Sequence, residues 1–126
     1  MEMLKFKPTY VREDGLTVIN DSSIEFPKDF VVKVRSVVVF PPGSKGGNHK
    51  HPRVEIFYSA GDLTFVYLDE SEQKHEISMA PEKENYKLFI VPSFLPHAVV
   101  NKTDKDLILM EYANEEQHDK VEIEII

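Results

Sequence analysis

Hydrophobic and polar residues alternate with a period of two along most of this 126-residue chain. The clearest example is the segment 30–40, which is rich in β-branched residues and places Lys33 and Arg35 on one face and Val32 and Val34 on the other. Successive side chains of an extended strand point to opposite faces, so this alternation predicts a half-buried strand.

Further short strands are predicted downstream, each bounded by turn residues. They cover residues 54–60, 63–68, 75–79, 88–91, 97–100, 107–112 and 121–126. A glycine-rich loop is expected over 43–48, and the only helix candidates, 80–85 and 114–118, are each under two turns. Many short strands separated by turns indicate an all-β sandwich or barrel. With no repeat or linker in view, we expect one domain over residues 1–126.

Composition and charge narrow the classes of function. Hydrophobic residues make up 41% and charged residues 29%, which is ordinary for a globular protein. The absence of cysteine excludes disulfides and thiolate metal sites. A net charge of -7 argues against nonspecific nucleic-acid binding and against docking on anionic membranes. No apolar run approaches the roughly 20 residues that cross a bilayer, and no signal peptide is visible, so we expect a cytoplasmic protein.

Four side chains of the kinds that bind metal ions lie in two separate segments. His49, His51 and Glu55 are close in sequence, and His97 lies more than forty residues later. On a strand, His49 and His51 would project from one face with their α-carbons about 6.6 Å apart, close enough for both to reach one ion. Imidazole and carboxylate ligands suit Zn, Fe, Mn, Ni and Co.

Glu55 reaches the same ion only if the chain bends. A straight strand would hold Glu55 about 13 Å from His51, too far for one coordination sphere. Pro52 belongs at a bulge or strand end, so we predict a corner at Pro52-Arg53 that carries Glu55 onto a second strand facing the same interior. His97 opens the later strand after a proline-rich turn, from which it could face that interior.

Taken in order, these residues resemble the two motifs of the cupin superfamily. The first motif is matched by Gly43, His49, His51, Glu55 and Gly61, and the second by Pro92, His97 and Asn101. The resemblance covers about residues 36–112 and implies an antiparallel double-stranded β-helix, or jelly-roll barrel. It also implies that His49, His51, Glu55 and His97 are the metal ligands and that the protein is a homodimer. Phe94 stands where the second motif has glycine, a residue that permits positive φ.

A narrower resemblance concerns cupin domains of capsular-polysaccharide and nucleotide-sugar enzymes. Residues 47–51 read Gly-Asn-His-Lys-His and are followed by Glu-Ile-Phe at 55–57, while 111–115 read Glu-Tyr-Ala-Asn-Glu. Both are similar to segments of those domains, which epimerise or isomerise 4-keto sugars on a nucleotide carrier. Gly46 stands where an arginine is common, and the loss of that guanidinium weakens the case for a diphosphate-bearing substrate.

The resemblance implies proton transfer beside a ketone. Such a reaction needs a base for the α-proton and an acid or a metal ion at the carbonyl oxygen. His49 and His51 are candidates for proton shuttling if they are not fully committed to a metal ion, and Tyr58 is a candidate donor whose alternative role is core packing. Lys50, Arg53 and Asn101 are candidates for substrate binding. For Lys50 and Arg53, a solvated strand end is the favoured alternative to ligand binding.

Two other functions fit the same ligand set. Histidines with a carboxylate also suit a non-haem iron dioxygenase. A third alternative is a non-catalytic cupin that binds a small molecule or a metal ion. In each case the expected partner is a small-molecule ligand, with a sugar or nucleotide-sugar favoured by the resemblance.

Overall fold

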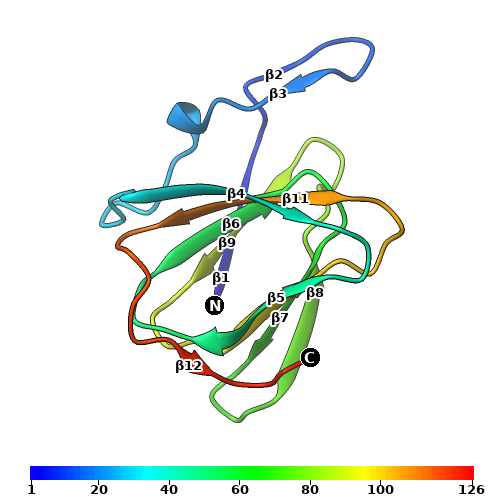
Figure 1. Cartoon of the computed structure of the whole chain (residues 1–126). Coiled ribbons are helices and arrows are strands. Elements are labelled where there is room, and N and C mark those ends of the chain that lie inside the picture. The colour runs from blue at the N-terminus through cyan, green and yellow to red at the C-terminus, as the bar shows by residue number, and fades with distance from the viewer.

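Two antiparallel five-stranded sheets face each other in the computed structural model, which describes residues 1–126 (Figure 1). The first sheet has the order β1 (Glu2–Phe6), β9 (Tyr86–Val91), β6 (Glu55–Ser59), β11 (Leu107–Ala113) and β4 (Val34–Phe40). The second has the order β12 (Val121–Glu122), β5 (Lys45–Lys50), β10 (His97–Val100), β7 (Thr64–Leu68) and β8 (Lys74–Ser78). The predicted all-β jelly-roll architecture is confirmed.

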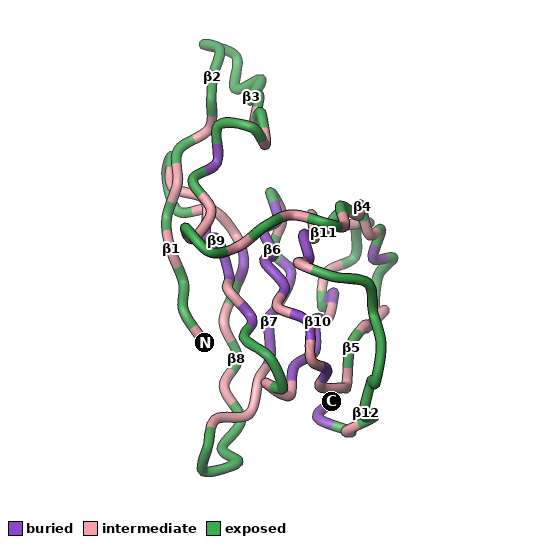
Figure 2. The backbone as a smooth tube through the Cα atoms, turned by 90° about the vertical axis from the view of Figure 1, so that its left-hand side faces the viewer, coloured by how far each residue is buried: buried purple, intermediate pink, exposed green.

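The main core lies between these two sheets. It is formed by inward-facing residues of six strands together with Leu63 and Met79. Phe57, Phe65, Phe89 and Leu109 are among the strand residues. Figure 2 shows the buried backbone positions gathered on the central strands β6, β7 and β10. This core follows directly from the period-two pattern, because each strand contributes every second side chain to the same interior.

A second core covers the outer face of the first sheet. Ile56 and Tyr58 of β6 pack there with Tyr112 of β11 and with Ile24 of the N-terminal segment. That segment also contains the short 3₁₀ helix η1 (Asp21–Ser23) and the small hairpin of β2 (Tyr10–Val11) and β3 (Thr17–Val18), which stands apart from the sandwich (Figure 1). Strand β6 is therefore buried on both faces, with all five residues inaccessible.

Several predicted elements differ from the structure. Neither helix candidate forms a helix, and the expected loop at 43–48 is largely strand β5. Tertiary pairing decides the second case, because β5 is held between β10 and β12 despite its two glycines. The N-terminal strands were not predicted, and β1 exists because it pairs with β9 across a long sequence separation. The chain holds no helix long and apolar enough to cross a membrane.

Candidate metal centre

A β-bulge in strand β5 aims His49 into the barrel. The pairing between β5 and β10 runs from His97 opposite His49 to Ala98 opposite Gly47, so Asn48 is the extra residue. Gly47 and Asn48 both have positive φ, at 86° and 57°. A Cβ on Gly47 would lie 2.8 Å from the carbonyl oxygen of His97. Only glycine fits here, because the two strands approach too closely for any side chain.

The predicted corner after His51 is present. Residues 51–54 leave strand β5 of the second sheet and bend, and Glu55 begins β6 in the first sheet. His51 therefore lies just past the end of one sheet, and Glu55 lies at the start of the facing sheet. This bend is what allows a histidine and a carboxylate four residues apart to point at the same place.

The turn before His97 is tied to that corner. The backbone N–H of Phe94 donates to the carbonyl oxygen of His51 at 2.8 Å, and the Ser93 hydroxyl donates to that of Pro52. Phe94 has a φ of 63°, so it adopts the left-handed conformation that the motif glycine would supply. The turn thus keeps its geometry without glycine, and its hydrogen bonds bring two distant segments of the chain together.

The four predicted ligands meet in one cluster. Ligand atoms of His49, His51, Glu55 and His97 all lie within 4.8 Å of one another. The three imidazole rings are 4.8–5.0 Å apart, centroid to centroid. His51, Glu55 and His97 are buried, while His49 is half-buried. The convergence of two segments forty residues apart is the central feature of the site.

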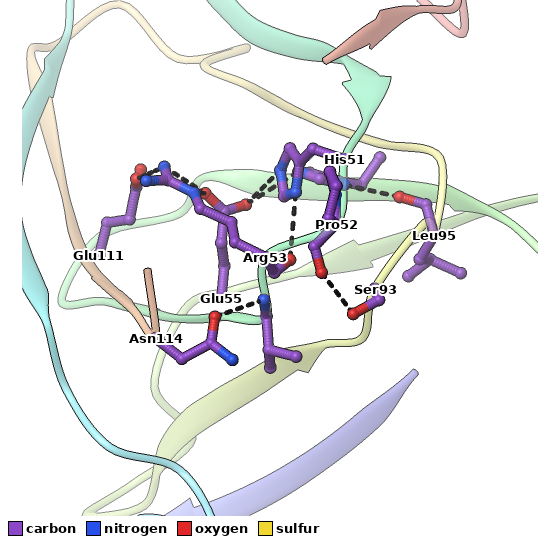
Figure 3. Close-up of polar contacts among 10 residues, drawn as sticks. His51, Pro52, Arg53, Glu55, Ser93, Leu95, Glu111 and Asn114 are labelled. Atoms are coloured by element: carbon purple, nitrogen blue, oxygen red, sulfur yellow. Dashed lines mark hydrogen bonds and ion pairs between the residues drawn. The ribbon is translucent and has the colours of Figure 1, made fainter. Parts of the chain in front are cut away.

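Two of the rings are held in the form that binds metal. Nδ1 of His51 lies 3.1 Å from the Arg53 carbonyl oxygen, and Nδ1 of His97 lies 2.8 Å from that of Leu95. A carbonyl oxygen only accepts, so each Nδ1 carries the hydrogen and each Nε2 keeps its lone pair. Those Nε2 atoms lie 3.0 Å and 3.2 Å from Oε1 of Glu55 (Figure 3).

Unpartnered atoms at the centre fit a bound cation. Nε2 of His51 and Oε1 of Glu55 are buried and have no hydrogen-bond partner, although they lie 3.0 Å apart. Buried polar atoms without partners are costly. A divalent ion bound by these lone pairs would satisfy both, so the residues present fit a metal ion, with His49, His51, Glu55 and His97 as its ligands.

The ionisation of the cluster also suits a cation. Burial by itself would raise the pKa of Glu55, but the neighbouring His51 and His97 hold it below its usual value. Burial, together with the charges of His97 and His51, lowers the pKa of His49 to about 4. A carboxylate that stays ionised and an imidazole that stays neutral are the forms that bind metal ions.

Arg53 and Glu111 form a second layer behind Glu55. Nε of Arg53 donates to Oε2 of Glu55 at 2.9 Å, and its Nη2 donates to Oε1 of Glu111 at 2.8 Å (Figure 3). Burial and the nearby charge of Glu55 raise the pKa of Glu111. Sequence reasoning missed Glu111 as a site residue. One signal in the sequence could have found it. Glu111 lies two positions after Leu109 on the same strand, so its carboxylate is on the core face of an otherwise apolar strand.

A cavity of about 230 Å³ opens beside the cluster. One part of its wall is apolar, and the other carries the polar groups of His49, Arg53, Glu55, His97 and Glu111. The apolar part is formed by Val38, Phe40, Phe57, Val99 and Leu109. A small ligand in this cavity would contact the histidine cluster on one side and hydrocarbon on the other.

Three residues predicted to act on the substrate do not reach this cavity. Tyr58 lies in the outer core, because it differs in parity from Glu55 on strand β6. Lys50 has the opposite parity to His49 and His51 and does not line the cavity. Asn101 is fully buried, and it uses its amide to bind the carbonyl oxygens of Phe40 and Lys105.

The side chain of Asn101 contacts only other parts of the chain. Its side-chain oxygen also accepts from the backbone and hydroxyl of Thr103, so it organises the turn between β10 and β11. Arg53 does line the cavity, but its Nε and Nη2 donors point at carboxylates rather than at open space. The prediction of a solvated strand end for Arg53 is wrong, because the residue is only 8% exposed.

Comparison with known proteins identifies the fold. No family model matches the sequence, and no curated protein matches it. Among solved structures, the capsular polysaccharide assembling protein CapF from Staphylococcus aureus is similar with a TM-score of 0.66 and 20% identity, over 98% of this chain and 35% of CapF. The TDP-fucose-3,4-ketoisomerase WlaRA from Campylobacter jejuni is similar with a TM-score of 0.65 and 16% identity, over 96% of this chain and 89% of WlaRA.

An oxalate oxidase is similar over a smaller part, with a TM-score of 0.59 and 20% identity, over 71% of this chain and 45% of the oxidase. All three are cupin-fold proteins. This chain therefore has the cupin fold, and it spans about a third of the length of CapF.

Proposed function

We propose that this protein is a metal-dependent isomerase or epimerase that acts on a keto sugar. The observation that carries the proposal is the convergence of three imidazoles and one carboxylate at the wall of a small cavity. The structural likeness to a TDP-fucose-3,4-ketoisomerase over nearly the whole of both chains supports this reaction class.

A bound divalent ion would polarise the substrate carbonyl as a Lewis acid. The chain's own residues have separate tasks. Arg53 fixes one oxygen of Glu55 and so orients its other oxygen. The ring of His49 has no hydrogen-bond partner in the structure and is only half-buried, so His49 is the candidate proton shuttle in any state in which it does not bind the ion. In isomerisation the base removes a proton from the carbon beside the ketone, the electron pair moves onto the carbonyl oxygen, and a proton returns to carbon.

The size of the cavity limits the part of a substrate that enters it. About 230 Å³ lies below the roughly 300–1,000 Å³ typical of drug-sized ligands. The only cationic side chain on its wall, Arg53, is already paired with two carboxylates. We therefore place the sugar ring inside the cavity, with its carbonyl toward the histidines. Any nucleotide carrier would extend into solvent.

Solvent deuterium tests the proposed reaction. The metal-loaded protein is incubated in D₂O with a panel of free and nucleotide-linked keto sugars, and deuterium at carbon is read by NMR. We expect incorporation beside the ketone for at least one sugar, and none with the His49→Ala variant. Complete absence of incorporation across the panel would reject the isomerase and leave a binding protein.

An iron dioxygenase is the second candidate, because the ligand set also suits iron and an oxalate oxidase shares the fold. Oxygen uptake by the iron-loaded protein, without deuterium incorporation, would favour it.

The predicted homodimer also stays a proposal. Strand β4 is one of the two edge strands of the first sheet, and its outward residues Val37 and Val39 are 62% and 56% exposed. Long apolar edges tend to pair, so we expect a second copy here. Sedimentation of Val37→Lys beside the unchanged chain checks it: a dimer that persists in the variant rejects this interface.

A further inference from the structure

The segment that contains β12, residues 121–126, is anchored at the bulge beside His49. Strand β12 lies beside β5 (Figure 1). The two strands pair with Glu122 opposite His49. Four hydrogen bonds join the segment to a single residue, Asn48. The backbone N–H groups of Ile125 and Ile126 donate to Oδ1 of Asn48 at 2.9 Å and 3.1 Å, and that of Ile123 donates to its carbonyl oxygen at 2.8 Å. Nδ2 of Asn48 donates to the Ile126 carbonyl oxygen at 3.0 Å.

Apolar contacts hold the same segment from the other side. Ile125 is only 7% exposed and packs against Val66 and Ala98. These two residues differ in parity from Phe65 and Val99 of the main core, so they lie on the outer face of the second sheet. The segment is therefore held by its backbone at the bulge and by a side chain on the sheet behind it.

The three histidines are not held in the same way. His51 and His97 are each oriented by a ring hydrogen bond to a carbonyl oxygen. The His49 ring has no such partner, so the backbone that carries it sets its direction. That backbone is the bulge, in which Asn48 has a φ of 57° that residues other than glycine adopt only at a cost. The four hydrogen bonds to residues 123–126 stabilise this conformation.

We propose that Asn48 is a positioning residue for the metal centre, and that docking of residues 121–126 and binding of the ion are thermodynamically linked. The docked segment holds the bulge, and the bulge keeps His49 aimed at His51 and His97. Linkage is reciprocal, so an ion that fixes His49 also stabilises the docked segment. The chain that leads into the segment places Gln117 on the cavity wall, so docking also completes the cavity. This inference uses the metal site proposed above and does not depend on the reaction.

Two variants loosen the segment by independent routes. Asn48→Gly keeps the positive φ but removes the three side-chain hydrogen bonds. Ile125→Ala removes the apolar contact on the outer face, away from the histidines. Glu124→Gln is the matched control, because Glu124 is exposed and belongs to the same segment. Zinc alone is the probe, its affinity is measured by calorimetry, and amide hydrogen exchange at Ile125 and Ile126 reports docking.

For both loosened variants we expect faster exchange at Ile125 and Ile126 and zinc affinity reduced by about tenfold or more, the size typical for losing a supporting contact. The control should match the unchanged chain, in which zinc should slow exchange at these amides. Unchanged zinc affinity in a variant with fast exchange would overturn the linkage. Slow exchange in both variants would overturn the role of Asn48. Failure of the unchanged chain to bind zinc would overturn the inference together with the metal site, whereas zinc binding without turnover would overturn only the proposed reaction.

Discussion

Arg53 holds one carboxylate oxygen of Glu55 and leaves the other facing the histidines. Its Nε and Nη2 lie 2.9 Å and 2.6 Å from Oε2, while Oε1 lies 3.0 Å from Nε2 of His51. The guanidinium also reaches Glu111, so one buried cation compensates the buried carboxylate of Glu55 and the partly buried carboxylate of Glu111. This arrangement resembles the outer-shell hydrogen bonds that orient metal ligands in proteins.

Replacing Arg53 by lysine should therefore weaken metal binding. Lysine keeps the charge but lacks the planar fork that reaches both carboxylates. We expect zinc affinity to fall by roughly 10- to 100-fold. Calorimetric titration measures it, with Arg12→Lys as the control because Arg12 forms an exposed pair with Asp14. Equal affinities for the two variants would show that Arg53 does not orient Glu55.

Replacing Gly47 by alanine should damage both the fold and the site. The new Cβ would meet the His97 carbonyl oxygen at 2.8 Å and the Ala98 Cα at 2.9 Å, in addition to the cost of a positive φ. We expect a loss of about 2–4 kcal/mol in the free energy of unfolding, from backbone strain and crowding together. Gly15→Ala is the control that measures the cost of a positive φ without crowding. Gly15 has a φ of 94°, but a Cβ added there would meet no atom within 4 Å.

Denaturant unfolding of both glycine variants gives the comparison. For Gly15→Ala the free energy of unfolding should fall by only about 1–2 kcal/mol, which is the cost of the positive φ alone. A Gly47 variant that is no less stable than the Gly15 variant would mean that the two strands can separate freely at the bulge.

Asn101 should prove structural rather than substrate-binding. Asn101→Ala leaves the carbonyl oxygen of Phe40 and the turn at Thr103 without partners. We expect about 2–4 kcal/mol of destabilisation, near 1 kcal/mol for each lost hydrogen bond. Zinc affinity should stay within about twofold, because Asn101 touches none of the four ligands. Thermal and denaturant unfolding, with Asn85→Ala as the control, check the first part. A stable variant with reduced ligand binding would restore the substrate-binding role.

Phe94→Gly should stabilise the protein. Phe94 has a φ of 63° and is 53% exposed, so it bears backbone strain while burying little of its ring. Glycine removes the strain, but it also gives the unfolded chain more conformational freedom, which offsets part of the benefit. We expect the free energy of unfolding to rise by about 0.5–1 kcal/mol. Phe94→Ala is the matched control and should show no gain, because alanine keeps the strain. A destabilised glycine variant would mean that the phenyl ring makes contacts worth more than the strain.

The sequence predicted the fold and the four clustered residues for clear physical reasons. The short strands predicted at 54–60 and 107–112 are present as β6 and β11, and Pro52 marked the corner that separates His51 from Glu55. Those are local properties of the chain. Tyr58 lies three positions after Glu55 on strand β6, and this odd offset already puts the two side chains on opposite faces. The motif resemblance gave no reason to apply that test.

The remaining features depend on partners that are distant in sequence. The bulge at Asn48 appears only when β5 is paired with β10, and its anchoring depends on residues 123–126. Arg53 and Glu111 are 58 residues apart, and nothing local indicates that they share a salt bridge. Asn101 occupies a position of the second sequence motif, yet it contacts none of the four clustered side chains. A residue that fits the motif can therefore stabilise the fold without taking part in the metal centre.

Metal content tests the central claim most directly. The unchanged chain, His51→Ala and His75→Ala are each loaded with zinc, dialysed and analysed for bound metal. His75 lies outside the cluster, beside Asp69, and serves as the control. We predict one ion per chain in the unchanged protein and in His75→Ala, and a large loss in His51→Ala, because three converging imidazoles are reduced to two. Equal metal content in all three proteins would contradict the account.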